Sequence, residues 1–231
     1  MSLYDLVITH DWEYDRDFVH LVEEAAGTRG LAPLLVAPSE VQAVLADFRS
    51  GTADFRLLFD RASGASPEFT ELQALAVERG RDVLDPLDRI RWASDKATMH
   101  LELLSAGLPT PHTVILPSFA AQPEVRVSPS ELAPLGVPFV IKPANTTGGS
   151  LGVIADASTA ADVTAARRTY PADKYLLQEK VHPEVVGGRR FWFRGFYVLG
   201  EVHLAWWDDR THVYGELPFA EAAGLGLVPL Y

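Results

Sequence analysis

One stretch of the sequence, residues 138–153 (PFVIKPANTTGGSLGV), constrains the fold more than any other. Its apolar start, residues 139–141, is rich in β-branched side chains and predicts a strand that ends on a single cation, Lys142, because Pro143 stops the ladder. The small residues 145–150 include two adjacent glycines, so the backbone there can turn tightly and direct several N–H groups at one point. The order strand, lysine, glycine loop, return strand suits the binding of a polyphosphate.

The glycine loop matches neither of the two most familiar phosphate-binding motifs. A Walker loop would read Gly-x-x-x-x-Gly-Lys-Ser/Thr, and a protein kinase would place its glycine loop before the lysine strand and add His-Arg-Asp and Asp-Phe-Gly motifs; the sequence contains none of these. A polar hairpin that merely contains a lysine stays open as the alternative. The candidate phosphate-binding residues are Lys142, Thr147, Gly148, Gly149 and Ser150.

The composition indicates a globular protein without a nucleic-acid partner. The 231 residues are 48% hydrophobic, which is enough to bury one large or two modest domains. A formal net charge of −11 without a run of Lys or Arg disfavours a phosphate backbone as partner. The absence of cysteine excludes disulfides and thiolate metal sites. Residues 6–8 are too few for a signal segment or a membrane span, so we expect a soluble, cytoplasmic protein.

The first ninety residues alternate between strand-like and helix-like patterns. Ser39 with Gln42, and Ser66 with Pro67, have the spacing of helix starts. Short connections between strand and helix imply parallel strands joined by right-handed crossovers. The alternating pattern therefore predicts that residues 1–93 form a Rossmann-like domain. Its predicted strands are residues 3–9, 34–37, 56–60 and 83–84.

The turn after the first strand lacks the dinucleotide-binding pattern Gly-x-Gly-x-x-Gly. Bulky residues, Trp12 and Glu13, stand there instead and would obstruct a pyrophosphate. Loops at the carboxyl ends of parallel strands often bind substrate. This makes polar residues at two strand ends candidates, although Asp60 and Arg61 can simply pair with each other. The candidates are His10, Asp11, Asp60 and Arg61.

A helix is predicted over residues 95–106. Ser94 has the character of an N-cap, and Leu101 and Leu104 are expected to pack inward. Lys96 falls in the first turn, where a cation opposes the helix dipole unless an anion lies nearby. Taken alone, Lys96 is a solvated surface lysine; an anion site would give it a function.

The strand predicted over residues 175–181 ends on polar residues. Backbone groups at alternate positions face the same way, so the carbonyl of Glu179 or Lys180 and the N–H of Val181 can together meet one edge of a planar ligand. The alternative is a strand end that becomes exposed to solvent.

Residues 189–207 predict a hairpin with a tight turn near Leu199 and Gly200. With a period of two, Arg190 and Arg194 share one face of the strand. Guanidinium groups bind phosphate or carboxylate in bidentate fashion, so both arginines are candidate catalytic residues. Pairing with Glu201 or Asp208 is the structural alternative for either one.

Together these motifs resemble the ATP-grasp superfamily, in which lysine, lysine, glycine loop and hinge follow one another in this order. The resemblance runs from residue 3 to about residue 216 and implies an α/β Rossmann-like pre-ATP-grasp domain followed by an α+β ATP-grasp domain. The boundaries expected on this basis are 1–93 and 94–231, with a nucleotide-binding subdomain at 112–178 and a partial second subdomain at 179–231.

By this resemblance, several residues would hold ATP. The two lysines would reach its phosphates, residues 178–181 would form the hinge for adenine, and Glu184 would accept the ribose hydroxyls. One of the two arginines would meet the γ-phosphate or an acyl phosphate. The expected cofactor-binding residues are Lys96, Lys142, Thr147, Gly148, Gly149, Ser150, Gln178, Glu179, Lys180, Val181 and Glu184.

The family includes D-alanyl-D-alanine ligase, glutathione synthetase and the ribosomal-protein glutamate ligases. Similarity to it implies that ATP, with Mg²⁺, activates a small carboxylate to an acyl phosphate that an amine or thiol then attacks. A catalytically silent nucleotide-binding module and a small-molecule kinase of the same superfamily stay open, as does a homodimer. The family places its magnesium ligands, an acidic residue and a later Glu-x-Asn pair, on strands that follow the predicted hairpin, where the sequence offers only Glu216 and Glu221. We therefore expect an ATP-grasp domain that is incomplete at its C-terminal end, assign no metal ligand, and expect this chain alone to be inactive.

Overall fold

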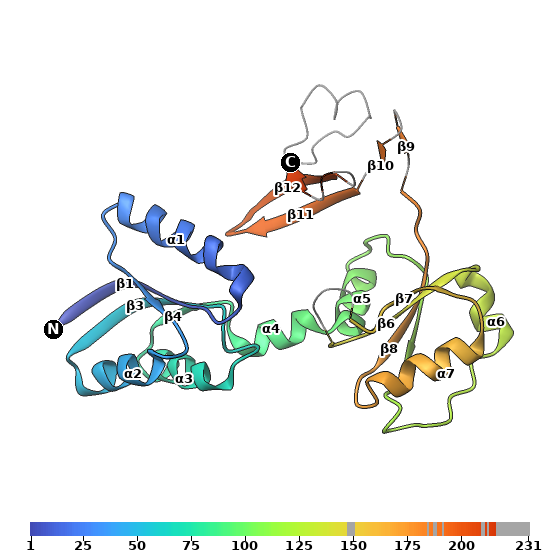
Figure 1. Cartoon of the computed structure of the whole chain (residues 1–231), viewed down its shortest axis with the longest axis horizontal. Helices are drawn as coiled ribbons and strands as arrows, with labels where there is room; N and C mark the ends of the chain where they lie inside the picture. Colours follow the sequence, from blue (N-terminus) through green and yellow to red (C-terminus); the bar gives the residue numbers. More distant parts are fainter. Residues whose placement is uncertain are drawn as a thin grey trace. The chain divides into compact units, whose positions relative to one another are not determined.

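The computed structural model describes residues 1–146, 151–183, 185–186, 189–190, 192–208, 211 and 213–215 (Figure 1). The chain divides into two compact units, Met1–Gln178 and Glu179–Tyr231. Parallel and antiparallel sheets occur together with helices, which confirms the predicted α/β fold class. The boundary expected between residues 93 and 94 stays a prediction.

The first unit begins with a parallel four-stranded sheet in the order β2-β1-β3-β4. Helix α1 lies on one face of this sheet, and α2 and α3 lie on the other (Figure 1). Right-handed crossovers produce this arrangement, because the chain moves from β1 to one side and from β2 to the other. The elements are β1 (Ser2–Thr9), α1 (Arg16–Thr28), β2 (Pro33–Val36), α2 (Val41–Ser50), β3 (Ala53–Asp60), α3 (Thr70–Glu78) and β4 (Asp82–Leu84), with 3-10 turns at Glu13–Asp15 and Pro67–Phe69.

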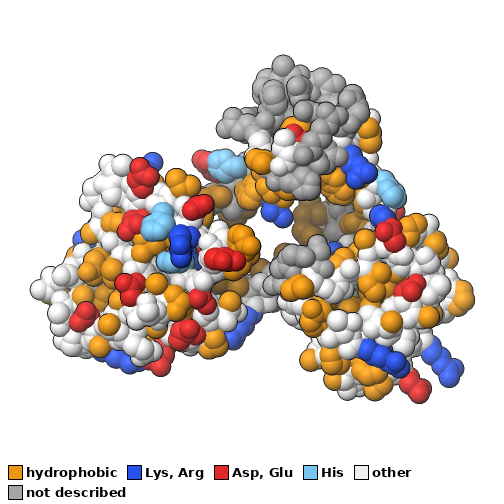
Figure 2. Space-filling model, in the orientation of Figure 1, with side chains coloured by type: hydrophobic (Ala, Val, Ile, Leu, Met, Phe, Trp, Pro, Cys, Tyr) orange, Lys and Arg blue, Asp and Glu red, His pale blue; other side chains and the backbone are white. Residues whose placement is uncertain are grey.

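The core of this sheet lies between its strands and helices α2 and α3. Phe48 of α2 packs against Phe55 of β3 with ring centroids 4.7 Å apart, and Leu72 of α3 is fully buried in the same cluster. On the opposite face, Phe18 of α1 contacts Phe59 edge to face. Apolar burial on both sheet faces, as expected for a doubly covered parallel sheet, therefore holds this part together. On the visible surface of this region, acidic and basic side chains are intermixed (Figure 2).

Of the two helix starts predicted in this region, one is wrong and one is confirmed. Helix α2 has Glu40 rather than Ser39 at its N-cap, and the Glu40 carboxylate accepts a hydrogen bond from the backbone N–H of Ala37 at 3.0 Å. Ser66 is the N-cap and Pro67 the first residue of a helical turn, as predicted, although the Ser66 hydroxyl donates to the carboxylate of Asp11 and not to the helix. A tertiary contact thus uses the polar group that local spacing had assigned to the helix.

The rest of the first unit contains a second four-stranded sheet in the order β5-β8-β6-β7. Strand β5 pairs with β8, and β6 with β7, in antiparallel fashion. The strands predicted before Lys142, after the glycine loop and at residues 175–181 are confirmed within a few residues. The elements are α4 (Leu87–Ser94), α5 (Lys96–Ser105), β5 (Thr113–Leu116), α6 (Pro129–Leu132), a 3-10 turn (Ala133–Leu135), β6 (Phe139–Pro143), β7 (Ile154–Ala157), α7 (Ala160–Thr169) and β8 (Tyr175–Glu179).

Helix α5 departs from its prediction at its start and on its buried face. Asp95, not Ser94, is the N-cap, and its carboxylate accepts from the N–H groups of Ala97 and Thr98. Ser94 instead ends α4, a helix that the sequence analysis did not predict. Leu101 and Leu104 are 54% and 50% exposed, so the expectation that they pack inward is wrong. The residues that α5 buries are Ala97 and His100.

The second unit contains a three-stranded antiparallel sheet, β11-β12-β13. The predicted hairpin and its tight turn are confirmed, with φ of 49° at Leu199 and 99° at Gly200. Arg190, however, lies in a separate strand that pairs with Val185, so its predicted place on the same strand face as Arg194 is wrong. The elements are β9 (Val185–Val186), β10 (Arg189–Arg190), β11 (Trp192–Val198), β12 (Glu201–Asp208) and β13 (Val213–Gly215).

In the described part of the chain, no helix combines the length and apolar character that crossing a membrane requires.

Gly152, which follows the glycine loop, provides a test of local packing. Its φ is +69°, and a Cβ there would lie 2.6 Å from Cε2 of Tyr170. We expect Gly152→Ala to lower the free energy of unfolding by about 2–4 kcal/mol, because left-handed strain adds to overpacking. Gly107→Ala is the control, since Gly107 has φ +73° and open space around it.

Urea denaturation of both variants measures the difference. Replacing Tyr170 by Ala in the Gly152→Ala background should remove the contribution of overpacking to the loss in free energy of unfolding. The contribution of backbone strain at residue 152 should remain. Equal losses for Gly152→Ala and Gly107→Ala would show that the ring of Tyr170 does not restrict this position.

Candidate functional site

Lys142 is the last charged residue of β6, and the sheet holds its side chain in place. Its Nζ donates to Oε1 of Gln178 on β8 at 2.7 Å, and Nε2 of Gln178 donates to Oγ1 of Thr113 on β5 at 2.9 Å. Three strands thus fix one ammonium group. Because Gln178 is neutral, it orients the lysine without cancelling its charge.

Lys96 is the first residue of α5, and it lies against the chain that enters the glycine loop. Its Nζ donates to the carbonyl oxygens of Ala144 and Thr146, both at 3.2 Å, and its backbone N–H donates to the Ala144 carbonyl at 3.0 Å. The structure therefore brings Lys96 to the loop, although 46 residues separate it from Lys142 in the sequence.

Both lysines line one small cavity of about 210 Å³. The cavity lies between α5 and the strands β6 and β8, and it also contains a buried histidine, His100, which sequence reasoning missed. The hydroxyl of Thr110 in this cavity is buried and has no hydrogen-bond partner in the described structure. The lining residues are Ala93, Lys96, Met99, His100, Leu103, Thr110, Pro111, Lys142, Leu176 and Gln178.

The cavity carries positive charge without a counter-ion. In the part of the chain that the structure describes, the ammonium of Lys142 contacts only an amide and that of Lys96 contacts only carbonyls. Burial, and then repulsion from Lys96, lower the pKa of Lys142 below its ordinary value. Two cations side by side without a carboxylate are an arrangement that a bound anion stabilises.

Asp173 fixes the start of the glycine loop. Its carboxylate accepts from the backbone N–H groups of Asn145 and Thr146, from the Asn145 amide at 2.9 Å and from the Thr146 hydroxyl at 3.0 Å. Burial alone would raise the pKa of Asp173, but these hydrogen bonds lower it below its ordinary value. No spacing in the sequence signals this role, because Asp173 lies 27 residues beyond Thr146.

A second acid, Asp95, fixes the start of α5. Besides capping the helix, it forms an ion pair with Lys174, the neighbour of Asp173. Burial would raise the pKa of Asp95, whereas the bond from Lys174 and those from the helix lower it. The segment that anchors the loop therefore also anchors the helix that carries Lys96.

The structure does not place every predicted site residue in this cavity. Thr147, Gly148, Gly149, Ser150 and Glu184 fall outside the described residues. Glu179 ends β8, and the half-buried Lys180 and the exposed Val181 follow it in the second unit. The roles assigned to these residues stay predictions.

Arg194 of β11 lies among aromatic rings within the second unit. Its guanidinium carbon is 5.0 Å from the ring centre of Tyr214 and 5.8 Å from that of Phe196. The carboxylate of Glu201, its proposed alternative partner, lies 3.6 Å from Nε2 of His203 instead. Arg194 also lines a cavity of about 330 Å³ with Trp192, Phe193, Trp207 and Tyr214. An arginine stacked in this way keeps its hydrogen-bond donors for a ligand.

At the carboxyl end of the N-terminal sheet, the side chains of Asp60 and Arg61 form hydrogen bonds with other groups of the protein. Arg61 donates to both carboxylate oxygens of Asp15, at 3.0 and 2.7 Å, so the expected pairing of Arg61 with Asp60 is wrong. Asp60 is buried and accepts from the hydroxyl of Thr9 at 2.8 Å and from two backbone N–H groups. Adjacent residues at a strand end point to opposite sides, which separates these two side chains. Their hydrogen bonds give both residues a structural role.

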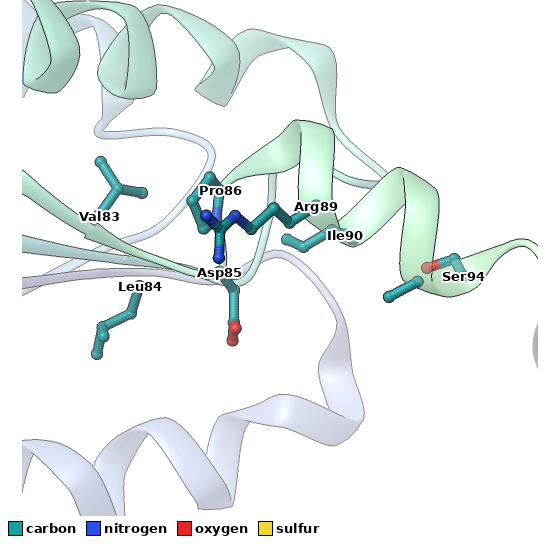
Figure 3. Close-up of a pocket in the computed structure, with 8 residues that line it drawn as sticks. Val83, Leu84, Asp85, Pro86, Arg89, Ile90 and Ser94 are labelled. Carbon is teal, nitrogen blue, oxygen red and sulfur yellow. The ribbon is translucent and has the colours of Figure 1, made fainter. Parts of the chain in front are cut away.

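A larger cavity of about 660 Å³ lies where β4 meets α4. Asp85, with φ of 58°, begins the turn, and Figure 3 shows the Arg89 side chain reaching back along α4 towards it. Ala93 lines both this cavity and the one that holds the two lysines. Sequence reasoning missed this cavity because it had not predicted α4.

Comparison with solved structures identifies the fold. No protein-family model and no curated protein matches the sequence. A RimK domain ATP-grasp protein from Sphaerobacter thermophilus aligns with a TM-score of 0.60 at 22% identity, over 96% of this chain and 79% of that one. D-alanine–D-alanine ligase from Bacillus anthracis, complexed with ATP, aligns with a TM-score of 0.57 at 14% identity, over 97% and 74%. The D-cycloserine synthetase DcsG aligns with a TM-score of 0.56 at 20% identity, over 98% and 82%.

The hydrogen bonds of Asp173 make stability depend on pH in a specific direction. Because its pKa is lowered on folding, the stabilisation is complete above the unfolded value near pH 3.9 and is lost as pH falls through the folded value. We expect Asp173→Asn to lower the free energy of unfolding by about 1.5–3 kcal/mol at pH 7, and by less at pH 3.

Urea denaturation at both pH values measures this difference. Asp82→Asn, at an exposed position on β4, is the control and should change little at either pH. A loss for Asp173→Asn that is the same at pH 7 and pH 3 would contradict a charge-dependent anchor.

Proposed function

Given the ATP-grasp fold of this chain, we propose that it binds ATP and belongs to an ATP-dependent ligase that joins a small carboxylate to an amine or thiol. The observation that supports this most directly is the pair of ammonium groups, Lys96 and Lys142, in one cavity without a carboxylate partner among the described residues. Such a pair is unfavourable unless an anion joins it, and a polyphosphate supplies the required charge.

Within this proposal the two lysines bind the phosphates, and Gln178 orients Lys142. The backbone of residues 179–181 is proposed to hold the adenine, with Glu184 on the ribose. The loop residues Thr147, Gly148, Gly149 and Ser150 are proposed to cover the phosphates. The anchor of that loop, Asp173, then sets where the loop begins.

The bound nucleotide would supply a phosphoryl group that activates the carboxylate. Arg194, with Arg190 as the second candidate, is proposed to bind the charged oxygens that form, since a guanidinium meets two oxygens at once. The described residues contain no group of three His, Asp or Glu side chains suited to a metal ion. Mg²⁺ therefore stays a prediction, and we assign it no ligand.

Removing one lysine tests nucleotide binding. Lys142→Ala should weaken ATP binding about tenfold to a hundredfold, because a charge-assisted contact contributes about 1.5–3 kcal/mol. Lys96→Ala should weaken ATP binding but change adenosine binding little, because its ammonium is assigned to phosphate. Isothermal titration calorimetry measures both ligands. Arg49→Ala removes one exposed charge on α2 and serves as the control.

Unchanged ATP affinity in both lysine variants would show that the cavity is not the phosphate site. An equal loss for ATP and adenosine in Lys96→Ala would remove its phosphate role.

Product analysis separates the proposed ligase from its alternatives. The protein is incubated with ATP, Mg²⁺ and a mixture of amino acids, and both ADP and new small molecules are measured by mass spectrometry. An amide or thioester formed together with ADP supports the ligase. A stable phosphorylated product indicates a kinase, whereas ATP binding without any product is the result expected both for this chain alone and for a silent nucleotide-binding module.

A further inference from the structure

His100 occupies an unusual position for a histidine. It lies one turn after Lys96 on α5, is only 8% exposed, and lines the cavity that holds both lysines. In the described part of the chain, neither nitrogen of its ring forms a hydrogen bond. A buried imidazole without a partner, facing a cavity, has hydrogen-bonding capacity that a ligand can use.

In the described part of the chain, the titratable side chains that line the cavity with His100 or act on its charge are basic. Lys96 comes from its own helix, Lys142 from β6, and His112 from the segment before β5, while Gln178 from β8 is neutral. Burial, and then repulsion from Lys142 and His112, lower the pKa of His100 below its ordinary value of 6.5. Both causes favour the neutral ring in the ligand-free protein.

Resting on the nucleotide site proposed above, we infer that binding of a polyphosphate to Lys96 and Lys142 is coupled to uptake of one proton by His100. The protonated ring then donates a hydrogen bond to a phosphate oxygen and becomes a third cationic contact. His100 is thus a binding residue that adjusts its charge to that of the ligand.

The charges in the cavity determine in which direction the affinity changes with pH. Without ligand, two ammonium groups oppose a third positive charge in the same cavity. A bound triphosphate brings three to four negative charges, which outweigh the two lysines and favour the imidazolium form. Because protonation and binding then support each other, affinity must rise as pH falls through the range between the free and bound pKa values of His100.

The coupling also distinguishes ligands by charge. A triphosphate should draw the proton more strongly than a monophosphate, because the charge added to the cavity is larger. Adenosine, which brings no negative charge, should bind without proton uptake.

Calorimetry in two buffers with different ionisation enthalpies counts the protons taken up. Inorganic tripolyphosphate and ATP are titrated at pH 6, 7 and 8 into the wild-type protein, His100→Gln and His20→Gln. His20 is an exposed histidine on α1 paired with Glu23, so its replacement is the matched control. Protonation of the ligand itself contributes equally to all three proteins, so the difference between them reports His100.

We expect the wild type and His20→Gln to take up between half a proton and one proton more than His100→Gln near pH 7. Between pH 8 and pH 6 their affinity for tripolyphosphate should rise about threefold to tenfold more than that of His100→Gln, since one proton corresponds to tenfold per pH unit at most. Equal proton uptake in all three proteins would overturn the inference and leave the nucleotide site intact. No binding of either ligand at any pH would overturn the proposed site itself.

A second measurement needs no variant at the buried position. The ring signals of His100 are followed by NMR during a pH titration, with and without tripolyphosphate. The apparent pKa of His100 should move upward when the ligand is bound. A pKa that stays the same with saturating ligand would contradict the coupling, whatever the behaviour of His100→Gln.

Discussion

Two like charges, the ammonium groups of Lys96 and Lys142, face one small cavity, and much of the surrounding structure keeps them there. Neutral acceptors hold both groups: Gln178 for one, the carbonyls of Ala144 and Thr146 for the other. A carboxylate in either place would have relieved the repulsion and filled the site. Orientation without neutralisation leaves the positive charge available to a ligand, which is why this cavity is the strongest functional candidate.

Two acids of this region, Asp173 and Asp95, do not line the cavity; they fix the segments that surround it. Asp173 binds the start of the glycine loop, and Asp95 caps α5 and pairs with Lys174. On the far side of the sheet, the buried Arg167 of α7 donates to the carbonyls of Pro117 and Gln122, at 2.9 and 2.7 Å. Charged groups therefore position the connections between strands, while the described residues that line the cavity are cationic or neutral.

At the N-terminal sheet, by contrast, the charged side chains are paired within the protein. Asp60 and Arg61 stand where parallel sheets often bind ligands, but Thr9 and two backbone N–H groups satisfy the first, and Asp15 satisfies the second. Satisfied hydrogen bonds stabilise a turn, whereas unsatisfied charge favours a ligand. This contrast within one chain is the reason why we propose nucleotide binding at the lysine cavity and not at the edge of the first sheet.

The sequence by itself determined the strands, their alternation with helices, the lysine at the end of β6, and the order of motifs along the chain. These features depend on neighbours a few residues apart, through side-chain periodicity, β-branched runs, proline and glycine. Only the tertiary structure decided the cap of α5, the face that this helix buries, and the partner of Arg61. It also revealed that Asp173 anchors the loop and that His100 lines the cavity. Contacts such as that between Lys174 and Asp95 join residues 79 positions apart, and no local pattern specifies which distant group will satisfy a given charge.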